Sequence, residues 1–450
     1  MKKLLIANRG EIAVRIINSA RSLGIATVAI ASEPDAESLA AMLADELVVV
    51  GPAQAAASYL NQEAVIKAAL DTGADAIHPG YGFLSENAEF ARAVVAAGLI
   101  WVGPDGNAIE LMGNKSQARE SAKNAGVPVL PGTEGPLAEG DDAIALAKEI
   151  GYPLVVKASA GGGGRGIRFV ESEAELLATI EMAQGEAGAI FGDPAVYMER
   201  FVQDARHVEV QILGDGTTFL HLGDRDCSMQ RRSQKVIEEA PAPALPEAVR
   251  ERMRSSSVEL ARACGYSGAG TIEFLYDPVR EEAAFIEMNT RLQVEHPITE
   301  AITGVDLVRE QLLIASTGKT TLTQEDISFS GHAIEARISA EDPFNNFFPS
   351  PGTITKMDWA TGPGIRVDSG FAAGSVVAPY YDSMLAKLIV HAPTRDQAIE
   401  AMNAALDATV IEGIKTTIPM HRALLARPEF ARVAHHSRFI ESTPDILETV

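Results

Sequence analysis

Two short apolar runs within residues 271–300 each carry one acidic side chain, Glu273 in the first and Glu287 in the second. Bulky residues at 271–276 and at 284–289 flank a polar turn that contains a proline, and this pattern predicts two antiparallel strands. A carboxylate buried on such strands is destabilising unless it is paired or binds a metal ion. The two acids are therefore candidates for a functional site.

Alternation along the second predicted strand adds polar groups to the same face. Side chains two apart on a strand point the same way, so Glu287, Asn289 and Arg291 should project together, and strand pairing could bring Glu273 alongside them. Two carboxylates and an amide oxygen are hard ligands, suited to Mg²⁺ that keeps waters and binds phosphate. We favour a magnesium site over the alternative, a structural ion pair between Glu287 and Arg291.

A run of four glycines follows a strand-like segment at 154–156 and Lys157. Consecutive glycines disfavour a helix and let backbone N–H groups approach an anion closely. The spacing matches G-x-G-x-x-G, but a strand-like run at 167–170 follows where a Rossmann motif would open a helix, and no Walker Gly-Lys-Ser/Thr is present. We interpret the segment as a hairpin flap over nucleotide phosphates, with Lys157 as a point charge; the alternative is a flexible surface loop.

Together these features resemble the ATP-grasp superfamily, and six ordered segments narrow the resemblance to the biotin carboxylases. These enzymes are components of the biotin-dependent acyl-CoA and pyruvate carboxylases. The segments are NRGEIAVRI (8–16), HPGYGFLSEN (78–87), KASAGGGGRGIR (157–168), RDCSMQRRSQKVIEEAPAP (225–243), EMNTRLQVEHPITE (287–300) and YYDSMLAKL (380–388). The resemblance extends from about residue 2 to about residue 440.

The resemblance implies an activity, the ATP- and bicarbonate-dependent carboxylation of biotin on a biotin carboxyl carrier protein or domain. This is the first half-reaction of an acyl-CoA or related carboxylase, and it proceeds through carboxyphosphate. ATP, Mg²⁺ (or Mn²⁺) and carrier-linked biotin are the implied cofactors. A carboxyltransferase component and a second copy of the chain, in a homodimer, are the implied partners. Because water would destroy the intermediates, the chemistry requires a closing flap.

The resemblance also implies roles for individual residues. Glu295 would be the base that deprotonates bicarbonate, and Arg337 would stabilise the enolate oxygen of biotin. The catalytic residues are then Glu295, Arg291, Lys235 and Arg337, and the metal ligands are Glu273, Glu287 and Asn289. Bicarbonate and biotin would contact Lys235, Arg291, Gln293, Val294 and Arg337. ATP would contact Lys115, Lys157, Gly163, Gly164, Glu199, Arg200, Phe201, Val202, His207 and Ser233.

Two of these roles have alternatives, and a third residue departs from the family pattern. Arg337 could instead form a salt bridge with Glu335 or Glu341. His207 is expected at the ribose or at a hinge, but it could equally be a satisfied polar residue on a strand. Ser233 stands where the family pattern leads us to expect histidine. Serine is shorter and uncharged, which puts one ribose contact in question.

Two other functions compete with biotin carboxylation. An ATP-grasp ligase that captures an amine on an acyl phosphate would share the magnesium strands and the flap. It would not need RLQVEHPITE followed by a separate arginine-bearing C-terminal domain, and both are present. A regulatory nucleotide-binding subunit would not need the full set of charged residues.

The bulk properties exclude several classes of protein. A formal charge of −23 argues against a nucleic-acid surface and against docking on anionic lipid. Cys227 and Cys264 give neither a zinc spacing nor a disulfide framework, which fits a reducing cytoplasm. No stretch has the length of a membrane span and the N-terminus lacks a secretory signal core. The chain lacks a biotinylation segment, so we expect a stand-alone subunit or the first domain of a longer polypeptide.

The 450 residues are enough for two or three domains, of α/β class at the start and α+β overall. Strand-like runs at 4–7 and 27–31 enclose a helical pattern at 11–23, which predicts the βαβ start of a parallel sheet. The alternation continues through 47–50, 59–72, 76–78, 88–97 and 100–102, and helices are also predicted at 115–125 and 395–409, with strands at 197–200, 207–213, 217–222 and 332–339. The predicted domains are a Rossmann-like domain at 1–113, an ATP-grasp domain at 114–315 with a mobile glycine-rich lid at about 131–203, and a β-rich C-terminal domain at 330–445.

Overall fold

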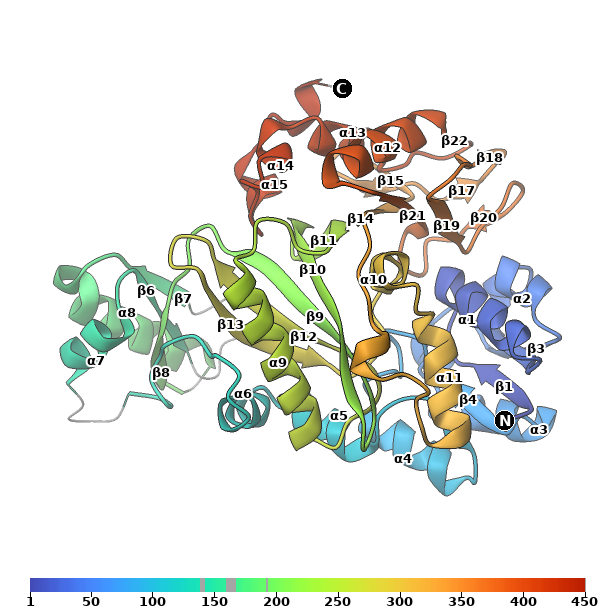
Figure 1. The fold of residues 1–450 in the computed structure, drawn as a ribbon, viewed down its shortest axis with the longest axis horizontal. Coiled ribbons are helices and arrows are strands. Elements are labelled where there is room, and N and C mark those ends of the chain that lie inside the picture. Colours follow the sequence, from blue (N-terminus) through green and yellow to red (C-terminus); the bar gives the residue numbers. More distant parts are fainter. Residues whose placement is uncertain (138–141, 159–166, 192, 450) are drawn as a thin grey trace. The chain divides into compact units, whose positions relative to one another are not determined.

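A computed structural model describes residues 1–137, 142–158, 167–191 and 193–449 of the chain (Figure 1). The chain forms two compact units. The first comprises residues 1–127, 206–274 and 286–450, and the second comprises residues 128–205 and 275–285. The glycine run at 161–164, with the predicted phosphate contacts Gly163 and Gly164, lies outside the described residues.

The first unit begins with the predicted parallel sheet. Its five strands lie in the order β3-β2-β1-β4-β5 and all pair in parallel. The strands are β1 (Lys3–Ile6), β2 (Ala26–Ser32), β3 (Glu46–Gly51), β4 (Ala76–His78) and β5 (Ile100–Trp101). The helices are α1 (Gly10–Ser22), α2 (Leu39–Leu43), α3 (Gln62–Thr72), α4 (Ala88–Ala96), α5 (Gly106–Gly113) and α6 (Lys115–Asn124). The predicted alternation of strand and helix is confirmed.

The predicted helix at 59–72 starts three residues late. A short 3₁₀ turn, η2 (Ala55–Ala57), precedes α3, and Tyr59 is buried outside the helix. Asn61 is the N-cap, because its side chain accepts a hydrogen bond from the backbone N–H of Ala64. The apolar pattern continues through Tyr59, so the cap residue marks the true start.

An eight-stranded sheet forms the centre of the first unit, in the order β13-β12-β9-β10-β11-β14-β21-β19. Its strands are β9 (Arg206–Asp215), β10 (Phe219–Arg231), β11 (Gln234–Ala240), β12 (Ser267–Asp277), β13 (Glu282–Asn289), β14 (His332–Ser339), β19 (Ile365–Ser369) and β21 (Met384–Ala392). The two strands predicted around the paired acids are confirmed as the neighbours β12 and β13. The predicted strand at 332–339 is β14.

The strand β14 was expected to open a separate C-terminal domain, but it pairs antiparallel with β11, with Ile237 opposite Ala336. Strands from the predicted ATP-grasp and C-terminal regions therefore belong to one hydrogen-bonded sheet. Sequence alternation identifies a strand but does not identify its neighbour. The domain boundaries at 113 and 330 stay predictions.

The strands β10 and β11 are joined by Arg232 and Ser233 alone. Both residues have a positive φ, 50° and 66°. A two-residue hairpin with both central residues in this region is a type I′ turn, whose twist matches the flanking strands. The turn therefore fixes where Ser233 stands relative to Lys235, which follows it on β11.

Helices cover the large sheet, and the last of them were not predicted. The helices are α9 (Glu247–Ala263), α10 (His296–Thr303), α11 (Leu307–Thr317), α12 (Arg395–Ala408), α13 (Ile418–Leu425), α14 (Pro428–Ala431) and α15 (Phe439–Ser442). The sequence pattern gave 395–409 as the last clear helix. The three that follow have between four and eight residues, too few for a helical period to stand out.

Short elements complete the chain. Two-stranded ladders join β15 (Glu341–Asp342) to β16 (Phe348–Pro349), β17 (Gly352–Thr353) to β20 (Val376–Val377), and β18 (Lys356–Asp358) to β22 (Val410–Glu412). The other 3₁₀ turns are η1 (Glu33–Asp35), η3 (Gln324–Asp326) and η4 (Ile446–Thr449). Among the residues that the structure describes, no helix is both long and apolar enough to cross a membrane.

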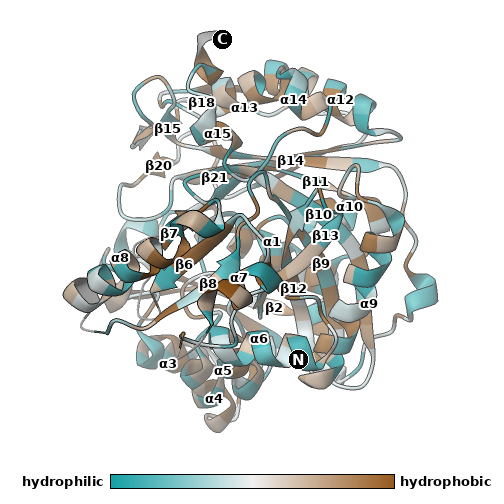
Figure 2. Ribbon diagram, turned by 90° about the vertical axis from the view of Figure 1, so that its left-hand side faces the viewer, coloured by the Kyte–Doolittle hydropathy of each residue, from teal (hydrophilic) through white to brown (hydrophobic). Residues whose placement is uncertain are grey.

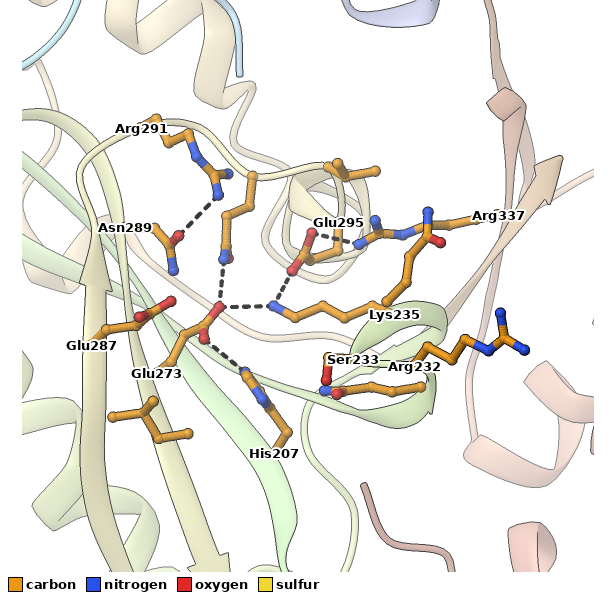
Figure 3. Close-up of a pocket in the computed structure, with 15 residues that line it drawn as sticks. His207, Arg232, Ser233, Lys235, Glu273, Glu287, Asn289, Arg291, Glu295 and Arg337 are labelled. Atoms are coloured by element: carbon orange, nitrogen blue, oxygen red, sulfur yellow. Dashed lines mark hydrogen bonds and ion pairs between the residues drawn. The ribbon is translucent and has the colours of Figure 1, made fainter. Parts of the chain in front are cut away.

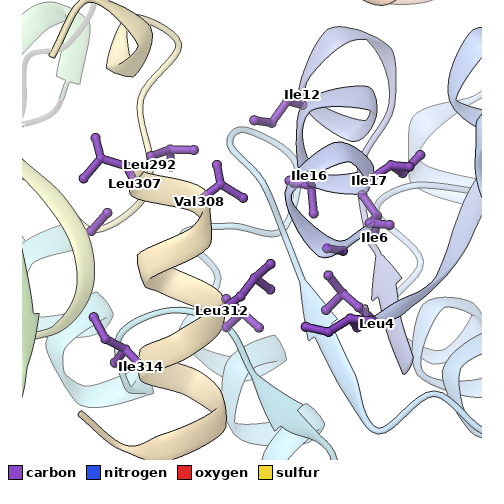
Figure 4. Packing of buried hydrophobic residues seen from close by; sticks show 14 of the residues in the cluster. Leu4, Ile6, Ile12, Ile16, Ile17, Leu292, Leu307, Val308, Leu312 and Ile314 are labelled. Atoms are coloured by element: carbon purple, nitrogen blue, oxygen red, sulfur yellow. The ribbon is translucent and has the colours of Figure 1, made fainter. Parts of the chain in front are cut away.

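One apolar core joins the parallel sheet to the rest of the first unit (Figure 4). Ile12 and Ile16 of α1 lie opposite Val308 and Leu312 of α11. Leu213 of β9 belongs to the same cluster. The parallel sheet and the central sheet therefore share a core, which explains why both belong to the same compact unit.

The second unit has a core of its own. A three-stranded antiparallel sheet in the order β7-β6-β8 is built from β6 (Leu154–Ala158), β7 (Ile167–Val170) and β8 (Val196–Arg200), with α7 (Ala143–Ile150) and α8 (Glu173–Phe191). Figure 2 shows the apolar character of β6 in brown. Leu154 and Met198 are fully buried with Leu176 of α8. The antiparallel pairing of β6 with β7 confirms the two predicted hairpin strands.

Candidate active site

A pocket of about 540 Å³ opens at the central sheet of the first unit (Figure 3). It collects most of the site residues that the sequence predicted in that unit. These are His207, Ser233, Lys235, Glu273, Glu287, Asn289, Arg291, Gln293, Val294, Glu295 and Arg337. Gln230, Arg232, Gln234 and Ile286 also line the pocket and were not predicted.

Strands from across the central sheet supply these side chains. His207 lies on β9, Lys235 on β11, Glu273 on β12, Glu287 and Asn289 on β13, and Arg337 on β14. The segment between β13 and α10 carries the residues from 291 to 295 across the same end of the pocket (Figure 3). Alternation places Glu287 and Asn289 on the same face of β13.

Lys235 connects three carboxylates. Its Nζ donates hydrogen bonds to Glu295 Oε1 at 2.6 Å, to Glu209 Oε2 at 2.7 Å and to Glu273 Oε1 at 2.9 Å. An ammonium group has three donors, so all of them are used. Burial opposes the charge of Lys235, but Glu209, Glu295 and Glu273 outweigh burial and raise its pKa well above the ordinary value. Lys235 is therefore a fixed cation.

Glu273 is an ionised carboxylate held by its neighbours. It accepts hydrogen bonds from Lys235 and from Gln293 Nε2, the latter at 2.9 Å, and His207 Nε2 lies 3.2 Å from its Oε2. Burial alone would raise its pKa, but Lys235 and then His207 outweigh burial and hold the pKa well below the ordinary value. Glu273 thus presents negative charge at the pocket wall.

Glu287 differs from Glu273 because it forms no ion pair with any residue that the structure describes (Figure 3). Burial raises its pKa, the charge of Glu273 adds to that effect, and Lys115 opposes it. The pocket therefore holds the carboxylate of Glu287, which has no ion-pair partner among the described residues, beside the carboxylate of Glu273. A divalent cation would neutralise both, so the donor set of Glu273, Glu287 and Asn289 fits Mg²⁺.

The alternative ion pair between Glu287 and Arg291 is not formed. Arg291 donates from Nε to Glu86 Oε2 at 2.8 Å and from Nη2 to Asn289 Oδ1 at 2.9 Å. Glu86 thus holds the guanidinium from outside the pocket. The Nδ2 of Asn289 is buried and has no hydrogen-bond partner among the described residues.

Glu295 lies between two cations. Its Oε1 accepts from Lys235 and its Oε2 accepts from Arg337 Nη2 at 2.9 Å (Figure 3). Burial alone would raise its pKa, but Lys235 and Arg337, with Arg225, outweigh burial and the charge of Glu209 and lower the pKa below its usual value. Glu295 is therefore ionised and able to accept a proton.

Arg337 forms neither of the salt bridges that we kept as alternatives. Its Nε donates to Glu238 Oε1 at 2.5 Å, and its Nη2 contacts Glu295. Glu341 pairs instead with Arg231 at 2.8 Å. The guanidinium faces the pocket and lies beside the carboxylate that would act as the base.

His207 is part of the carboxylate cluster. Its Nε2 lies 3.2 Å from Glu273 Oε2 and 3.7 Å from Glu209 Oε2. Burial alone would lower its pKa, but Glu273 and Glu209 together outweigh burial and the charge of Lys235, and the pKa rises to about 9. His207 thus lies beside carboxylates of its own strand β9 and of β12. Its contact with ribose stays a prediction.

Several residues that organise the pocket were missed by sequence reasoning. Glu209 interrupts the apolar run of β9 in the same way that Glu273 interrupts β12, so the same criterion would have found it. Arg225 is fully buried and donates to Glu209 and to Gln293 Oε1, at 2.6 and 2.9 Å. Glu238 holds Arg337, and no local signal separates it from its neighbour Glu239.

The remaining predicted ATP contacts lie elsewhere. Lys115 begins α6 of the first unit, at an exposed position. In the second unit, Lys157 is paired with Glu199. Arg200 donates to Ile150 O at 2.9 Å and to Glu282 Oε2 at 2.8 Å. Phe201 packs edge-on against Phe169, and Val202 is buried. Their ATP roles stay predictions.

Models of three families match the chain. "Biotin carboxylase, N-terminal domain" matches residues 1–109, "Carbamoyl-phosphate synthase L chain, ATP binding domain" matches residues 114–323, and "Biotin carboxylase C-terminal domain" matches residues 335–442. The chain is 52% identical over 444 residues to biotin carboxylase 1 of Bacillus subtilis, with 98% of each chain covered.

Solved structures are similar over the same length. The biotin carboxylase domain of a thermophilic 2-oxoglutarate carboxylase, bound to ADP, matches with a TM-score of 0.94 and 46% identity, and 99% of each chain is covered. The corresponding domain dimer from Hydrogenobacter thermophilus, in complex with MgADP, ADP and bicarbonate, matches with a TM-score of 0.86 and 46% identity. There the match covers 99% of this chain and 98% of that one.

Proposed function

Since this chain belongs to the biotin carboxylase family, we propose an assignment of its pocket residues to the steps of that family's reaction. The chain is an ATP-dependent ligase that carboxylates biotin, with ATP and Mg²⁺ as cofactors. The observation that carries the assignment is Glu295, an ionised carboxylate held between Lys235 and Arg337.

Glu295 is the base that takes the proton of bicarbonate. Lys235 and Arg337 hold its pKa low, so it is ionised and ready to accept a proton. Redirecting Lys235 toward bicarbonate would weaken that hold and make Glu295 more basic, which is the tuning that general-base catalysis needs. Arg291, Gln293 and the backbone of Val294 line the pocket and complete the anion site.

Glu287, Glu273 and Asn289 would hold Mg²⁺, which when bound neutralises charge on the ATP phosphates. The unpaired carboxylate of Glu287 supports this role. Arg337 would stabilise the enolate oxygen of deprotonated biotin, and its position beside Glu295 supports placing biotin next to the bicarbonate. Ser233, on the tight turn before β11, would face the nucleotide.

For the partners, we propose a biotin carboxyl carrier protein or domain and a carboxyltransferase component. A homodimer is supported by the similar Hydrogenobacter thermophilus domain, which is described as a dimer. A cytoplasmic location is supported by two free cysteines, as is usual in reducing compartments.

The test is ADP production by the purified chain. ATP hydrolysis should be slow with ATP and Mg²⁺ alone and faster when bicarbonate and free biotin are both added. Free biotin should bind weakly, because the tether that raises its effective concentration is missing. If neither compound changes the rate of ADP production, the result would favour the amine-ligase or the regulatory alternative over the carboxylase assignment.

A further inference from the structure

Two carboxylates that the reaction does not use face each other beside Arg337. Glu238 lies on β11 and Glu335 lies on β14, directly opposite each other in the antiparallel register. Both are fully buried. Opposite residues on antiparallel strands have Cβ atoms about 4.5–5.5 Å apart and point to the same face. The pair therefore occupies one small region of the sheet.

The two carboxylates have different partners. Glu238 Oε1 accepts the 2.5 Å hydrogen bond from Arg337 Nε, and Arg337 Nη2 reaches the same oxygen at 2.5 Å. Neither oxygen of Glu335 accepts a hydrogen bond from a residue in the described ranges. A buried carboxylate without a hydrogen bond is stable only in its neutral form. The geometry therefore favours an ionised Glu238 and a protonated Glu335.

We propose that Glu238 is a positioning residue that aims the guanidinium of Arg337 at the biotin site, and that Glu335 is the neutral, protonated partner that leaves Glu238 free to carry the charge. This inference rests on the role proposed for Arg337. Two facing carboxylates in a dry region cannot both ionise, because like charges at this separation repel strongly. A neutral Glu335 therefore makes an ionised Glu238 possible.

The reaction itself requires an anchor that is separate from the base. When Glu295 takes up a proton, it stops being an anion, and its hold on Arg337 weakens. Glu238 remains as the second carboxylate in contact with that guanidinium. It can therefore keep Arg337 in place while negative charge develops on biotin, without reacting itself.

The surroundings of the pair agree with this division of charge. The charged and titratable groups around it are Arg337 on β14, Lys235 on β11, Cys227 on β10, Glu295 before α10 and Lys387 on β21. Burial raises the pKa of Glu335 well above its ordinary value, and Lys387 only partly offsets this. Burial also raises the pKa of Glu238, to about 7, against the opposing charge of Arg337. Glu335 thus keeps its proton at a pH where Glu238 releases one.

The test uses two isosteric variants of one buried pair. Glu238→Gln removes the charge that anchors Arg337, so the biotin-dependent rate at saturating ATP and bicarbonate should fall at least about 10-fold, as when an outer partner of a catalytic group is lost. Bicarbonate-dependent ATP cleavage without biotin should stay within about twofold, because it does not need Arg337 to be aimed. Glu335→Gln resembles the protonated acid and should keep both rates within about twofold.

A pH profile adds a readout that a merely structural role would not move. The biotin-dependent rate of the wild type and of Glu335→Gln should rise with pH through about 7, as Glu238 ionises, and this limb should be absent in Glu238→Gln. If Glu238→Gln does not fold, as judged by thermal melting, Glu238→Asp keeps the charge at shorter reach and should lower only the biotin-dependent rate.

The outcomes separate the two claims. Equal losses in the assays with and without biotin would remove the positioning role of Glu238. A loss in Glu335→Gln as large as in Glu238→Gln would overturn the division of charge between them. A wild-type protein whose ADP production ignores bicarbonate would instead overturn the proposed function.

Discussion

At the scale of single residues, the pocket combines carboxylates that are fully paired with one that is not. Lys235, His207 and Gln293 contact Glu273, whereas Glu287 contacts none of the described cations. Paired carboxylates keep the geometry of the pocket, and the unpaired one leaves room for a cation. This difference in pairing supports the proposed role of Glu287 as a metal ligand.

Glu287→Gln should therefore abolish most of the activity without unfolding the protein. The substitution keeps the shape of the side chain and removes a hard anionic ligand, so the Mg²⁺ concentration at half-maximal rate should rise by at least about 10-fold. Magnesium titration of ADP production measures this, and a circular dichroism melt provides the control for folding. A normal magnesium requirement would show that Glu287 has no metal role.

The raised pKa of Glu238 also has a consequence for stability. A pKa of about 7 in the folded state lies above the ordinary value of 4.5, so between these pH values the folded state holds a proton that the unfolded state has released. Stability should therefore fall as the pH rises through this window, by about 3 kcal/mol in total.

Glu238→Gln removes this dependence. Relative to the wild type, its free energy of unfolding should be higher at pH 8 than at pH 5 by about 2.5 kcal/mol, although its biotin-dependent rate is lower. Urea denaturation at the two pH values measures the difference. Glu335→Gln should change the pH dependence in the same direction, because burial also raises the pKa of Glu335 above its ordinary value and the folded state keeps that proton over this window. Parallel pH profiles for Glu238→Gln and the wild type would contradict the assignment.

At the scale of elements, one arginine fastens the last helices to the sheet. Arg395, at the start of α12, contacts both oxygens of Glu239 on β11, at 2.6 and 3.0 Å. It also donates to the carbonyl oxygens of Phe430 and Ala431. Glu239 is buried, so its carboxylate needs the contacts with this guanidinium and with His332.

Arg395→Ala should lower the free energy of unfolding by about 3–5 kcal/mol, because it leaves a buried carboxylate without its main partner. Arg422→Ala provides a control from the same region. Arg422 pairs with Asp407 at 2.9 Å on the surface, and its loss should change stability by less than about 1 kcal/mol. If urea denaturation gave similar losses of unfolding free energy for the two variants, the buried Arg395–Glu239 pair would contribute no more to stability than the exposed pair.

The sequence was most informative where structure is local. The strands around Glu273 and Glu287 and the hairpin strands around the glycine run follow from alternation and turn residues within short segments. The pairing of β11 with β14 does not, because their contact depends on the packing of segments far apart in the chain. For the same reason the salt bridges considered as alternatives for Arg337 involved residues close to it in the sequence, Glu335 and Glu341, whereas its partners come from β11 and from the segment before α10.

At the scale of the whole molecule, two units with separate cores should respond separately to mutation. Leu154→Ala removes a fully buried side chain from the second unit and should destabilise it by about 2–5 kcal/mol. Proteolytic cleavage within residues 128–205 should accelerate, while the first unit resists.

Leu312→Ala is the matched control, because Leu312 is equally buried in the core of the first unit. It should increase cleavage in the first unit and leave the second unaffected. The fragments from limited proteolysis, identified by mass spectrometry, distinguish the two. Cleavage of both units in each variant would show that they unfold together.

The continuous central sheet also limits how genes of this kind can recombine. A crossover between β11 and β14 would join strands from different parents at the ladder that places Glu238 opposite Glu335. A slip of one residue there would turn Arg337 to the other face of the sheet. Exchange at the borders of residues 128–205, the longer segment of the second unit, would leave this ladder intact. Chimeras built by swapping that unit should keep their chemistry, and those cut between β11 and β14 should lose it.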